Sequence, residues 1–170
     1  DYAKGNRIGY LSGDSETERK IVSFYNMRFF DGKMRMYLVK TFEEFKNEFL
    51  RAQDEVDMLF IYNHAGIKEW DAEAAKKFLA QHTKIPTGAH TSFMVPFVMF
   101  NVSKYAEEQG SYAARTVLKI LDGAKPSDIP LTTNKRSKLT VNLKMAKAAG
   151  IVVPISVLKR AVVVGQESLD

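Results

Sequence analysis

Alternating strand and helix patterns constrain the fold of this chain more than any other feature of its sequence. Between residues 7 and 89, three apolar runs are each followed by a helical pattern, and a fourth apolar run closes the series. Such alternation is typical of an α/β domain in which helices cover a mostly parallel sheet. The sequence therefore predicts a three-layer α/β lobe, with strands over residues 7–11, 34–39, 56–62 and 85–89.

Helix start signals indicate where the first three helices begin. Ser15 and Glu18 have the spacing of a capping box, as do Thr41 and Glu44, and Asp71 precedes the third helix. The apolar residues that follow recur at helical spacing and predict the buried faces of these helices. They are Ile21, Phe24, Tyr25 and Phe29 in the first helix, Phe42, Phe45, Phe49 and Leu50 in the second, and Phe78 and Leu79 in the third.

The second half of the chain carries a less regular pattern. A strand is predicted over 97–101 and a helix over 103–122, which Gly123 and Pro126 end. The remaining apolar runs predict a short strand over 129–133, a strand over 139–143, a short helix up to Gly150 and an apolar segment over 154–158.

Composition and motifs argue against several classes of function. The chain contains no cysteine, which rules out disulfides, thiolate metal sites and cysteine nucleophiles, and which fits an oxidising compartment. It also has no Walker loop, Gly-x-Gly-x-x-Gly motif or nucleophile elbow. Adjacent acidic pairs such as Glu43-Glu44 do not face each other on a helix. We therefore expect no catalytic residues, no cofactor and no enzyme activity.

Charge gives little reason to expect a nucleic-acid partner. The net charge is +5, and no stacking aromatics are interleaved with the basic residues of the second half. A solvated basic face is the better interpretation of the cluster at Lys135, Arg136, Lys138, Lys144 and Lys147. No apolar run approaches the roughly 20 residues that span a bilayer. We expect any signal segment to lie outside this chain.

Seven segments of the chain share a resemblance to known sequences. They are 7–10, 12–16, 100–110, 113–114, 118–123, 126–130 and 141–151. These segments resemble one family, the ABC transporter substrate-binding proteins related to tryptophan and tyrosine binders. The likeness extends over essentially the whole chain and is weakest between Asn63 and Trp70.

The resemblance implies the type I periplasmic-binding fold, in which two Rossmann-like lobes joined by three crossovers close over a ligand. On this plan residues 1–92 form the second lobe, 93–126 a strand and helix of the first lobe, and 127–170 the return crossover and C-terminal helices. The chain then corresponds to the C-terminal portion of such a protein, or to one chain of a split one. We expect the strand at 97–100 and the following helix to lack their sheet. They would pack on a missing N-terminal lobe or on a second copy of the chain, because large apolar patches mark interfaces.

The same resemblance implies a periplasmic or other extracytoplasmic protein that captures a small organic solute, such as an amino acid. Hinge closure would then present the solute to an ABC permease. Two alternatives stay open. An extracytoplasmic ligand-sensing domain of a signalling receptor would be favoured by a transmembrane helix after Asp170. A Rossmann- or flavodoxin-like enzyme would be favoured by a bound flavin or nucleotide.

Candidate ligand contacts follow from the predicted sheet. In open α/β sheets, ligands bind beyond the carboxyl ends of strands, where helix N-termini favour a carboxylate. The residues at those ends are Ser12, Asp14, Ser15, Asn63, His64, His90, Thr91 and Phe93. Ser12 and Asp14 fit turn positions equally well, and Ser15 is also the expected helix cap. An aspartate at this rim could pair a ligand amine.

Aromatic residues complete the expected site. His64 and His90 lack a third ligand at suitable spacing, so we expect cleft hydrogen bonds or surface positions for them and no metal. Phe93 lies in the expected hinge and could line an apolar pocket, although the density of Met and Phe around it is typical of core packing. Trp70 fits either a hydrophobic staple before the third helix or a wall of the cleft.

Overall fold

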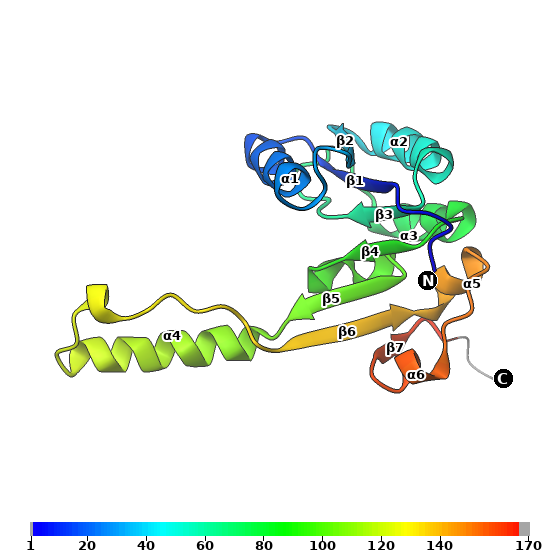
Figure 1. The fold of residues 1–170 in the computed structure, drawn as a ribbon. Helices are drawn as coiled ribbons and strands as arrows, with labels where there is room; N and C mark the ends of the chain where they lie inside the picture. Colours follow the sequence, from blue (N-terminus) through cyan, green and yellow to red (C-terminus); the bar gives the residue numbers. More distant parts are fainter. Residues whose placement is uncertain (1, 167–170) are drawn as a thin grey trace.

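A single seven-stranded sheet organises the chain. The computed structural model describes residues 2–166 and gives the strand order β2-β1-β3-β4-β5-β6-β7 (Figure 1). The strands are β1 Ile8–Gly13, β2 Arg35–Val39, β3 Met58–Ile61, β4 Thr87–Ala89, β5 Phe100–Lys104, β6 Ser137–Asn142 and β7 Val162–Val164. The helices are α1 Glu16–Phe29, α2 Phe42–Glu55, α3 Ala72–His82, α4 Ala106–Leu121, α5 Leu143–Ala148 and α6 Ile155–Leu158, with short 3-10 turns η1 Ser92–Phe97 and η2 Pro126–Asp128.

The predicted α/β class is confirmed. Strands β1 to β5 are parallel to their neighbours, β6 runs antiparallel to β5, and β7 is parallel to β6. The sheet continues without a break across positions 92 and 126. The last four residues of the third predicted section, 167–170, lie outside the described residues.

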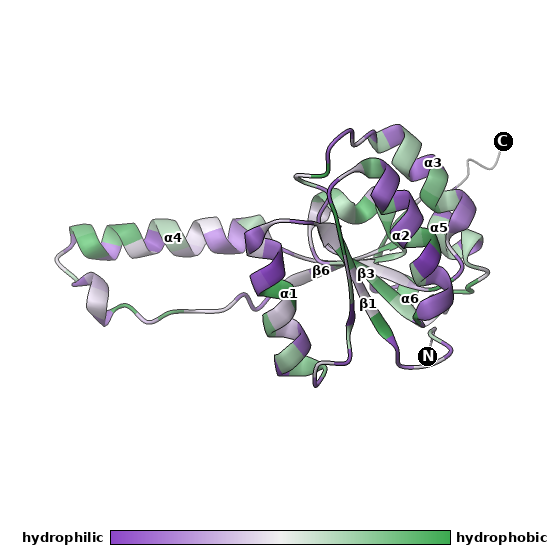
Figure 2. Cartoon of the chain, turned by 90° about the horizontal axis from the view of Figure 1, so that it is seen from above, coloured by the Kyte–Doolittle hydropathy of each residue, from purple (hydrophilic) through white to green (hydrophobic). Residues whose placement is uncertain are grey.

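The order of strands sets where a ligand can bind. The chain passes from β1 to β2 on one side and then returns past β1 to β3, so the strand order reverses at β1. Right-handed crossovers then place α1 on one face of the sheet and α2 and α3 on the other (Figure 2). In open α/β sheets, ligands bind at such a reversal, beyond the carboxyl ends of the strands. The region beyond the ends of β1 and β3 is here called the crevice.

The predicted helix caps form. The Ser15 hydroxyl accepts the backbone N–H of Glu18 at 3.1 Å, and the Thr41 hydroxyl accepts that of Glu44 at 3.2 Å. The Asp71 carboxylate accepts two N–H groups of the third helix, from Glu73 and Ala74. These bonds satisfy donors that a helix N-terminus otherwise leaves unpaired.

The predicted buried faces are right for α2 and α3 and wrong for α1. Phe45, Phe49 and Leu79 lie in the core. In α1, however, the buried residues are Glu18, Val22 and Asn26. The predicted Phe24 and Phe29 are 60% and 62% exposed, and Leu50 in α2 is 39% exposed. Helix α1 is thus rotated by about a quarter turn or more from the expected orientation, because polar Glu18 and Asn26 find hydrogen-bond partners beneath it.

The second half of the chain departs further from prediction. The predicted strand over 97–101 begins only at Phe100, because residues 92–97 form the 3-10 turn η1 with Pro96 inside it. Strand β5 pairs with both β4 and β6, so the expectation that it lacks a sheet is wrong. The segment 129–133 forms no strand, because it runs beside α4 and pairs with no strand edge. Strand β7 was not predicted.

Residues 105–136, here called the arm, project away from the rest of the chain, here called the body (Figure 1). The arm consists of α4 and a returning segment. The Tyr112 hydroxyl donates to the carbonyl of Pro130 at 2.8 Å, and the Glu108 carboxylate accepts the N–H groups of Lys135 and Arg136. No residue of α4 is buried, and Leu121 is 76% exposed. As predicted, this helix packs on no sheet of the described chain.

Within residues 2–166, no helix is both long and apolar enough to cross a membrane.

Candidate ligand-binding site

Hydrogen bonds hold the loops at the carboxyl ends of β1 and β3 close together. The carbonyl of Asn63 accepts the N–H of Gly13 at 3.2 Å and the hydroxyl of Ser12 at 3.3 Å. A Cβ at position 13 would lie 2.9 Å from the carbonyl oxygen of Ala65, so only glycine allows the two loops to approach this closely. These contacts bring Ser12 and Asn63 together, as the sequence predicts for one edge of a parallel sheet.

A buried carboxylate lies under this crevice. Glu18 is only 7% exposed, and its Oε2 accepts the hydroxyls of Tyr10 at 2.9 Å and Ser12 at 3.2 Å. Burial, followed by the bond to Glu18, raises the pKa of Tyr10 well above its usual range. Sequence reasoning assigned Glu18 to a capping box and missed this network. The signal for it was the pair of polar residues, Tyr10 and Ser12, on one face of a strand directly before Glu18.

Asp14 and Ser15 form the rim at the start of α1. The guanidinium of Arg19 donates two bonds of 2.6 Å to the carboxylate of Asp14, and these bonds hold the pKa of Asp14 below its usual range. Ser15 is exposed and caps α1. The first turn of the helix presents its N–H groups here. Arg19, which sequence reasoning did not select, therefore compensates the negative charge of Asp14 at this rim.

His64 belongs to an aromatic cluster on the side of α2 and α3. Its ring stacks on Trp70 with centroids 4.8 Å apart and planes 6° apart, and it meets the ring of Phe93 edge-on at 5.4 Å. Burial lowers the pKa of His64, so the imidazole is neutral at pH 7. Phe93 stays 48% exposed. Together, His64 and Phe93 form an aromatic surface at the mouth of the crevice.

Trp70 fixes the position of that surface. Its ring lies edge-on to Phe45 at 5.0 Å and to Phe97 at 5.5 Å, which anchors it to the main core. Its indole N–H is buried without an acceptor among the described residues. Trp70 therefore supports His64 from behind.

His90 and Thr91 lie at the end of β4, and the structure separates the two histidines. The His90 ring contacts Tyr62 at 4.8 Å and Phe60 at 5.5 Å, two residues of the smaller cluster beneath α1, whereas the neighbours of His64 belong to the main core. Burial lowers the pKa of His90 as well. The carbonyl of Thr91 accepts the side-chain amide of Asn101 at 2.8 Å, which ties this loop to β5.

Because they pack on opposite sides of the sheet, His64 and His90 do not share a metal site. Within residues 2–166, no group of three or more His, Asp or Glu side chains is placed to hold a metal ion.

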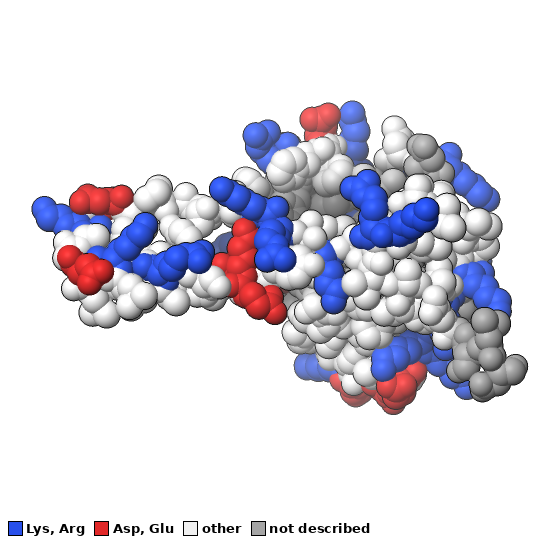
Figure 3. Space-filling model, turned by 90° about the horizontal axis from the view of Figure 1, so that it is seen from below, with Lys and Arg blue, Asp and Glu red and all other residues white. Residues whose placement is uncertain are grey.

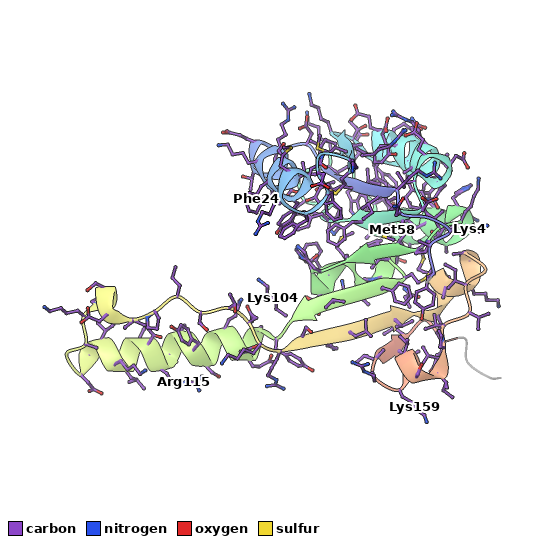
Figure 4. All side chains as sticks on the ribbon, in the orientation of Figure 1. Lys4, Phe24, Met58, Lys104, Arg115 and Lys159 are labelled. Atoms are coloured by element: carbon purple, nitrogen blue, oxygen red, sulfur yellow. The ribbon has the colours of Figure 1, made fainter. Side chains whose placement is uncertain are left out.

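Two strands connect the site to the arm. Strand β5 leaves the body at Lys104, which Figure 4 labels at the junction, and β6 returns with Ser137 opposite Lys104. A change in the direction of this ribbon would swing the arm relative to the crevice. Basic side chains are scattered over the face seen in Figure 3, with acidic ones gathered near the base of the arm. No continuous basic patch appears on this face.

The sequence matches the family model "ABC transporter substrate binding protein" over residues 32–164. This chain belongs to that family. The predicted resemblance is confirmed, and the family is one of substrate-binding proteins, not of enzymes. The search of curated proteins found no match.

Solved structures with the same fold extend this result. A ligand-free, open substrate-binding protein with adhesive properties from Clostridium difficile superimposes with a TM-score of 0.71 and 21% identity, over 98% of this chain and 57% of that one. An ABC domain in complex with L-Trp from Streptococcus pneumonia gives a TM-score of 0.64 and 21% identity, over 96% and 57%. A conserved domain protein from Vibrio cholerae gives 0.62 and 18%, over 92% and 54%.

At these identities the neighbours show the fold. This chain spans only a little over half the length of each of them.

Proposed function

We propose that this chain forms the second lobe and the crossover elements of an extracytoplasmic protein that captures a small organic solute for an ABC importer. The observation that carries this proposal is the reversal of the strand order at β1. There, the ends of β1 and β3 meet, and the ribbon of β5 and β6 leads from the neighbouring strand toward the arm. Membership of the substrate-binding family supports the transport role.

The chemistry of the crevice favours a solute that carries a carboxylate and an apolar or aromatic group, such as an amino acid. The N–H groups of the first turn of α1 suit a carboxylate, and the carboxylate of Asp14, which is paired with Arg19, suits a ligand amine. The neutral ring of His64 and the exposed ring of Phe93 offer a stacking surface. The Streptococcus neighbour was solved in complex with L-Trp, which agrees in chemistry with this choice.

Within this proposal, Ser12 and Glu18 position the crevice and do not contact the solute, because both are buried and bonded to each other. Asn63 shapes the loop, since its side-chain oxygen accepts the N–H of Ala65 at 2.8 Å. The proposed direct contacts are His64, Phe93 and the rim at Asp14 and Ser15. His90 and Thr91 border the crevice from the next strand.

Closure requires a second jaw, which we propose to be the N-terminal lobe of the same protein. The exposed apolar residues Val117, Leu118 and Leu121 make α4 a docking surface for it. A solute held between the two jaws favours the closed state through its higher affinity for that state, and the ABC permease would recognise the closed form. A second copy of this chain is the alternative cover for α4.

Isothermal titration of the intact two-lobed protein against a panel of amino acids tests the proposal. Phe93→Ala should weaken binding about tenfold, the effect of losing one aromatic contact. Phe24→Ala is the matched control, because Phe24 is also an exposed phenylalanine but lies on α1. It should leave affinity unchanged. Equal effects of the two substitutions, or no heat with any solute of a broad panel, would contradict the proposal.

A further inference from the structure

Strand β5 ends, at the carboxyl edge of the sheet, with a lysine that has no ionic partner. Lys104 is the last residue of β5 and lies at the junction between body and arm (Figure 4). Its side chain is exposed and forms no salt bridge with any carboxylate of residues 2–166. Its partner in the ladder, Ser137, is uncharged. The solute contacts proposed above leave this cation without a role.

The alternation of β5 places Lys104 on the side of the sheet that carries α1. Successive side chains of a strand point to opposite faces. Asn101 and Ser103 are buried on one face. Phe100, on the other face, lines an apolar groove beside α1. Val102 and Lys104 share the face of Phe100, and both are exposed. Lys104 therefore stands at the carboxyl end of the α1 face.

His90 and Tyr62 lie on the same side of the sheet. Burial lowers the pKa of His90, and the nearby cation of Lys104 lowers it further. The ring of His90 meets the ring of Tyr62 edge-on, with centroids 4.8 Å apart. The hydroxyl of Tyr62 has no hydrogen-bond partner within residues 2–166. An ammonium, an imidazole and a phenol hydroxyl, all able to donate hydrogen bonds, thus gather at one place.

No carboxylate of the described chain neutralises this group of donors at the surface. Among residues 2–166, the carboxylate whose charge acts on His90 is that of Glu18. Glu18 is only 7% exposed, and its Oε2 already accepts the hydroxyls of Tyr10 and Ser12. The surface at Lys104 is therefore positive and suits an anionic group, because hydrogen bonds between a cation and an anion are stronger than neutral ones.

The distance from the rim of α1 decides which anionic group can reach Lys104. Asp14 follows β1, and Lys104 ends β5, three strand intervals away in the order β1-β3-β4-β5. At about 4.8 Å per interval, the two backbones are roughly 14 Å apart. The amine and the carboxylate on one α-carbon are separated by only two bonds. A solute whose amine contacts Asp14 therefore cannot bring its α-carboxylate to Lys104, whereas a second, distal anionic group can extend toward it.

We propose that Lys104, together with His90 and Tyr62, binds a side-chain carboxylate of the solute and so selects for an acidic solute. The carboxylate would lie three or more bonds from the α-carbon, whose own amine and carboxylate occupy the rim of α1. The apolar chain between the two charged ends would rest on His64 and Phe93. This inference rests on the proposed function and adds to it the class of solute.

Isothermal titration of the intact two-lobed protein with L-glutamate, L-2-aminoadipate and L-glutamine tests the inference. At least one of the two acids should bind tenfold or more tightly than the amide, because glutamine keeps the length of glutamate and loses its charge. Lys104→Met should weaken binding of that acid about tenfold, the loss of one charge-assisted contact, and should change glutamine binding less than twofold. Lys104→Arg, which keeps the charge, should restore most of the affinity.

Lys138→Met is the matched control. Lys138 is an exposed lysine of the adjacent strand β6, and it lies opposite Ser103, so its side chain points to the other face of the sheet. This variant should leave the affinity for both solutes unchanged. Circular dichroism checks that each variant folds.

A second measurement on the 170-residue chain needs no solute. Lys104→Met should raise the pKa of His90, measured by proton NMR, because the cation that opposes protonation of the imidazole is removed. Lys138→Met should leave the pKa of His90 unchanged. An unchanged pKa in Lys104→Met would show that Lys104 does not stand beside His90, and it would overturn the inference.

The titration separates failure of the inference from failure of the proposed function. If a solute binds but the acids gain nothing over glutamine, or if Lys138→Met weakens binding as much as Lys104→Met, the inference fails and solute capture stands. If no solute of a broad panel binds, the proposed function fails and the inference falls with it.

Discussion

The body and the arm carry the same kind of helical pattern and use it differently. In α2 of the body, Phe45 and Phe49 are 1% and 0% exposed, because β1, β2 and β3 lie beneath them. In α4 of the arm, Val117 and Leu121 are 54% and 76% exposed, because no sheet of this chain faces them. The comparison teaches that apolar periodicity specifies a face to be buried but does not specify its partner.

The two faces of the sheet repeat this contrast within the body. Helices α2 and α3 complete one layer, whereas α1 alone leaves a groove on the other. The groove, which Tyr25, Phe29 and Phe100 help to line, and the apolar side of α4 are the incomplete surfaces of the described chain. The following experiments test whether the body is complete enough to fold alone and whether the arm depends on a partner.

The largest expected effect separates a body phenylalanine from an arm leucine. Phe49→Ala should lower the free energy of unfolding by about 3–5 kcal/mol, because it empties a fully buried site. Leu121→Ala should change it by less than about 0.5 kcal/mol in this chain. Urea unfolding followed by circular dichroism measures both. Similar losses for the two variants would erase the distinction between body and arm.

The buried carboxylate gives the next largest effect. Glu18→Ala leaves the buried hydroxyl of Tyr10 without its acceptor and leaves that of Ser12 only the carbonyl of Asn63, so it should cost about 1–3 kcal/mol of unfolding free energy. Glu18→Gln keeps an acceptor oxygen and should cost less. Glu107→Ala, at an exposed acid in the first turn of α4, is the arm control and should be nearly neutral. Denaturant midpoints rank the three variants. A loss of unfolding free energy in Glu107→Ala as large as that in Glu18→Ala would contradict the contrast between arm and body.

A pH dependence should arise from the body alone. Burial lowers the pKa of His64 and His90 below the usual 6.5, so the unfolded chain takes up protons first as the pH falls. Stability should therefore be constant between about pH 7 and pH 8 and should fall as the pH drops below 6.5. The double variant His64→Gln, His90→Gln should show a shallower fall between pH 7.5 and 5 in urea unfolding. If the double variant loses stability with falling pH as steeply as the parent chain, these histidines are not the cause of the pH dependence.

The smallest expected effect tests the arm directly. Lys104 and Ser137 are partners in the antiparallel ladder, so Asn-Gly can join them as a two-residue hairpin in place of residues 105–136. The shortened chain should keep its unfolding free energy, because α4 buries nothing and a short loop costs less entropy to close. Because the arm contains no histidine, the fall in stability between pH 7.5 and 5 should persist as well. An unfolded product would show that the body needs the arm.

Local chemistry made much of the body predictable. The caps at Ser15, Thr41 and Asp71 depend on groups within three residues of one another, and all three form. The four strands predicted before residue 90 exist, with ends shifted by at most two residues. The orientation of α1 was not predictable, because it depends on bonds from Glu18 to Tyr10 and from Asn26 to the carbonyl of Met34, and only the folded chain brings these groups together.

The sequence predicted which edge of the sheet carries the candidate residues, but it did not predict most of their contacts. Parallel strands put their carboxyl ends at one edge, which is why Ser12 and Asn63 meet as expected. The pairing of Asp14 with Arg19 and the stacking of His64 on Trp70 were not foreseen. The direction of a side chain at a strand end depends on the loop that follows, and His64 and His90 thereby reach opposite faces.

The sequence by itself determined the α/β class and the starts of the first three helices, because these follow from periodicity or from contacts between near neighbours in the chain. It also determined the edge of the sheet at which Ser12 and Asn63 meet, because the carboxyl ends of parallel strands lie at one edge. Tertiary structure alone decided that β5 and β6 join the sheet, that α1 turns a polar face downward, and that α4 and the groove stay uncovered. These outcomes depend on which surfaces meet across long stretches of chain. An apolar surface that lacks its packing partner shows the periodicity of a buried face and yet is exposed.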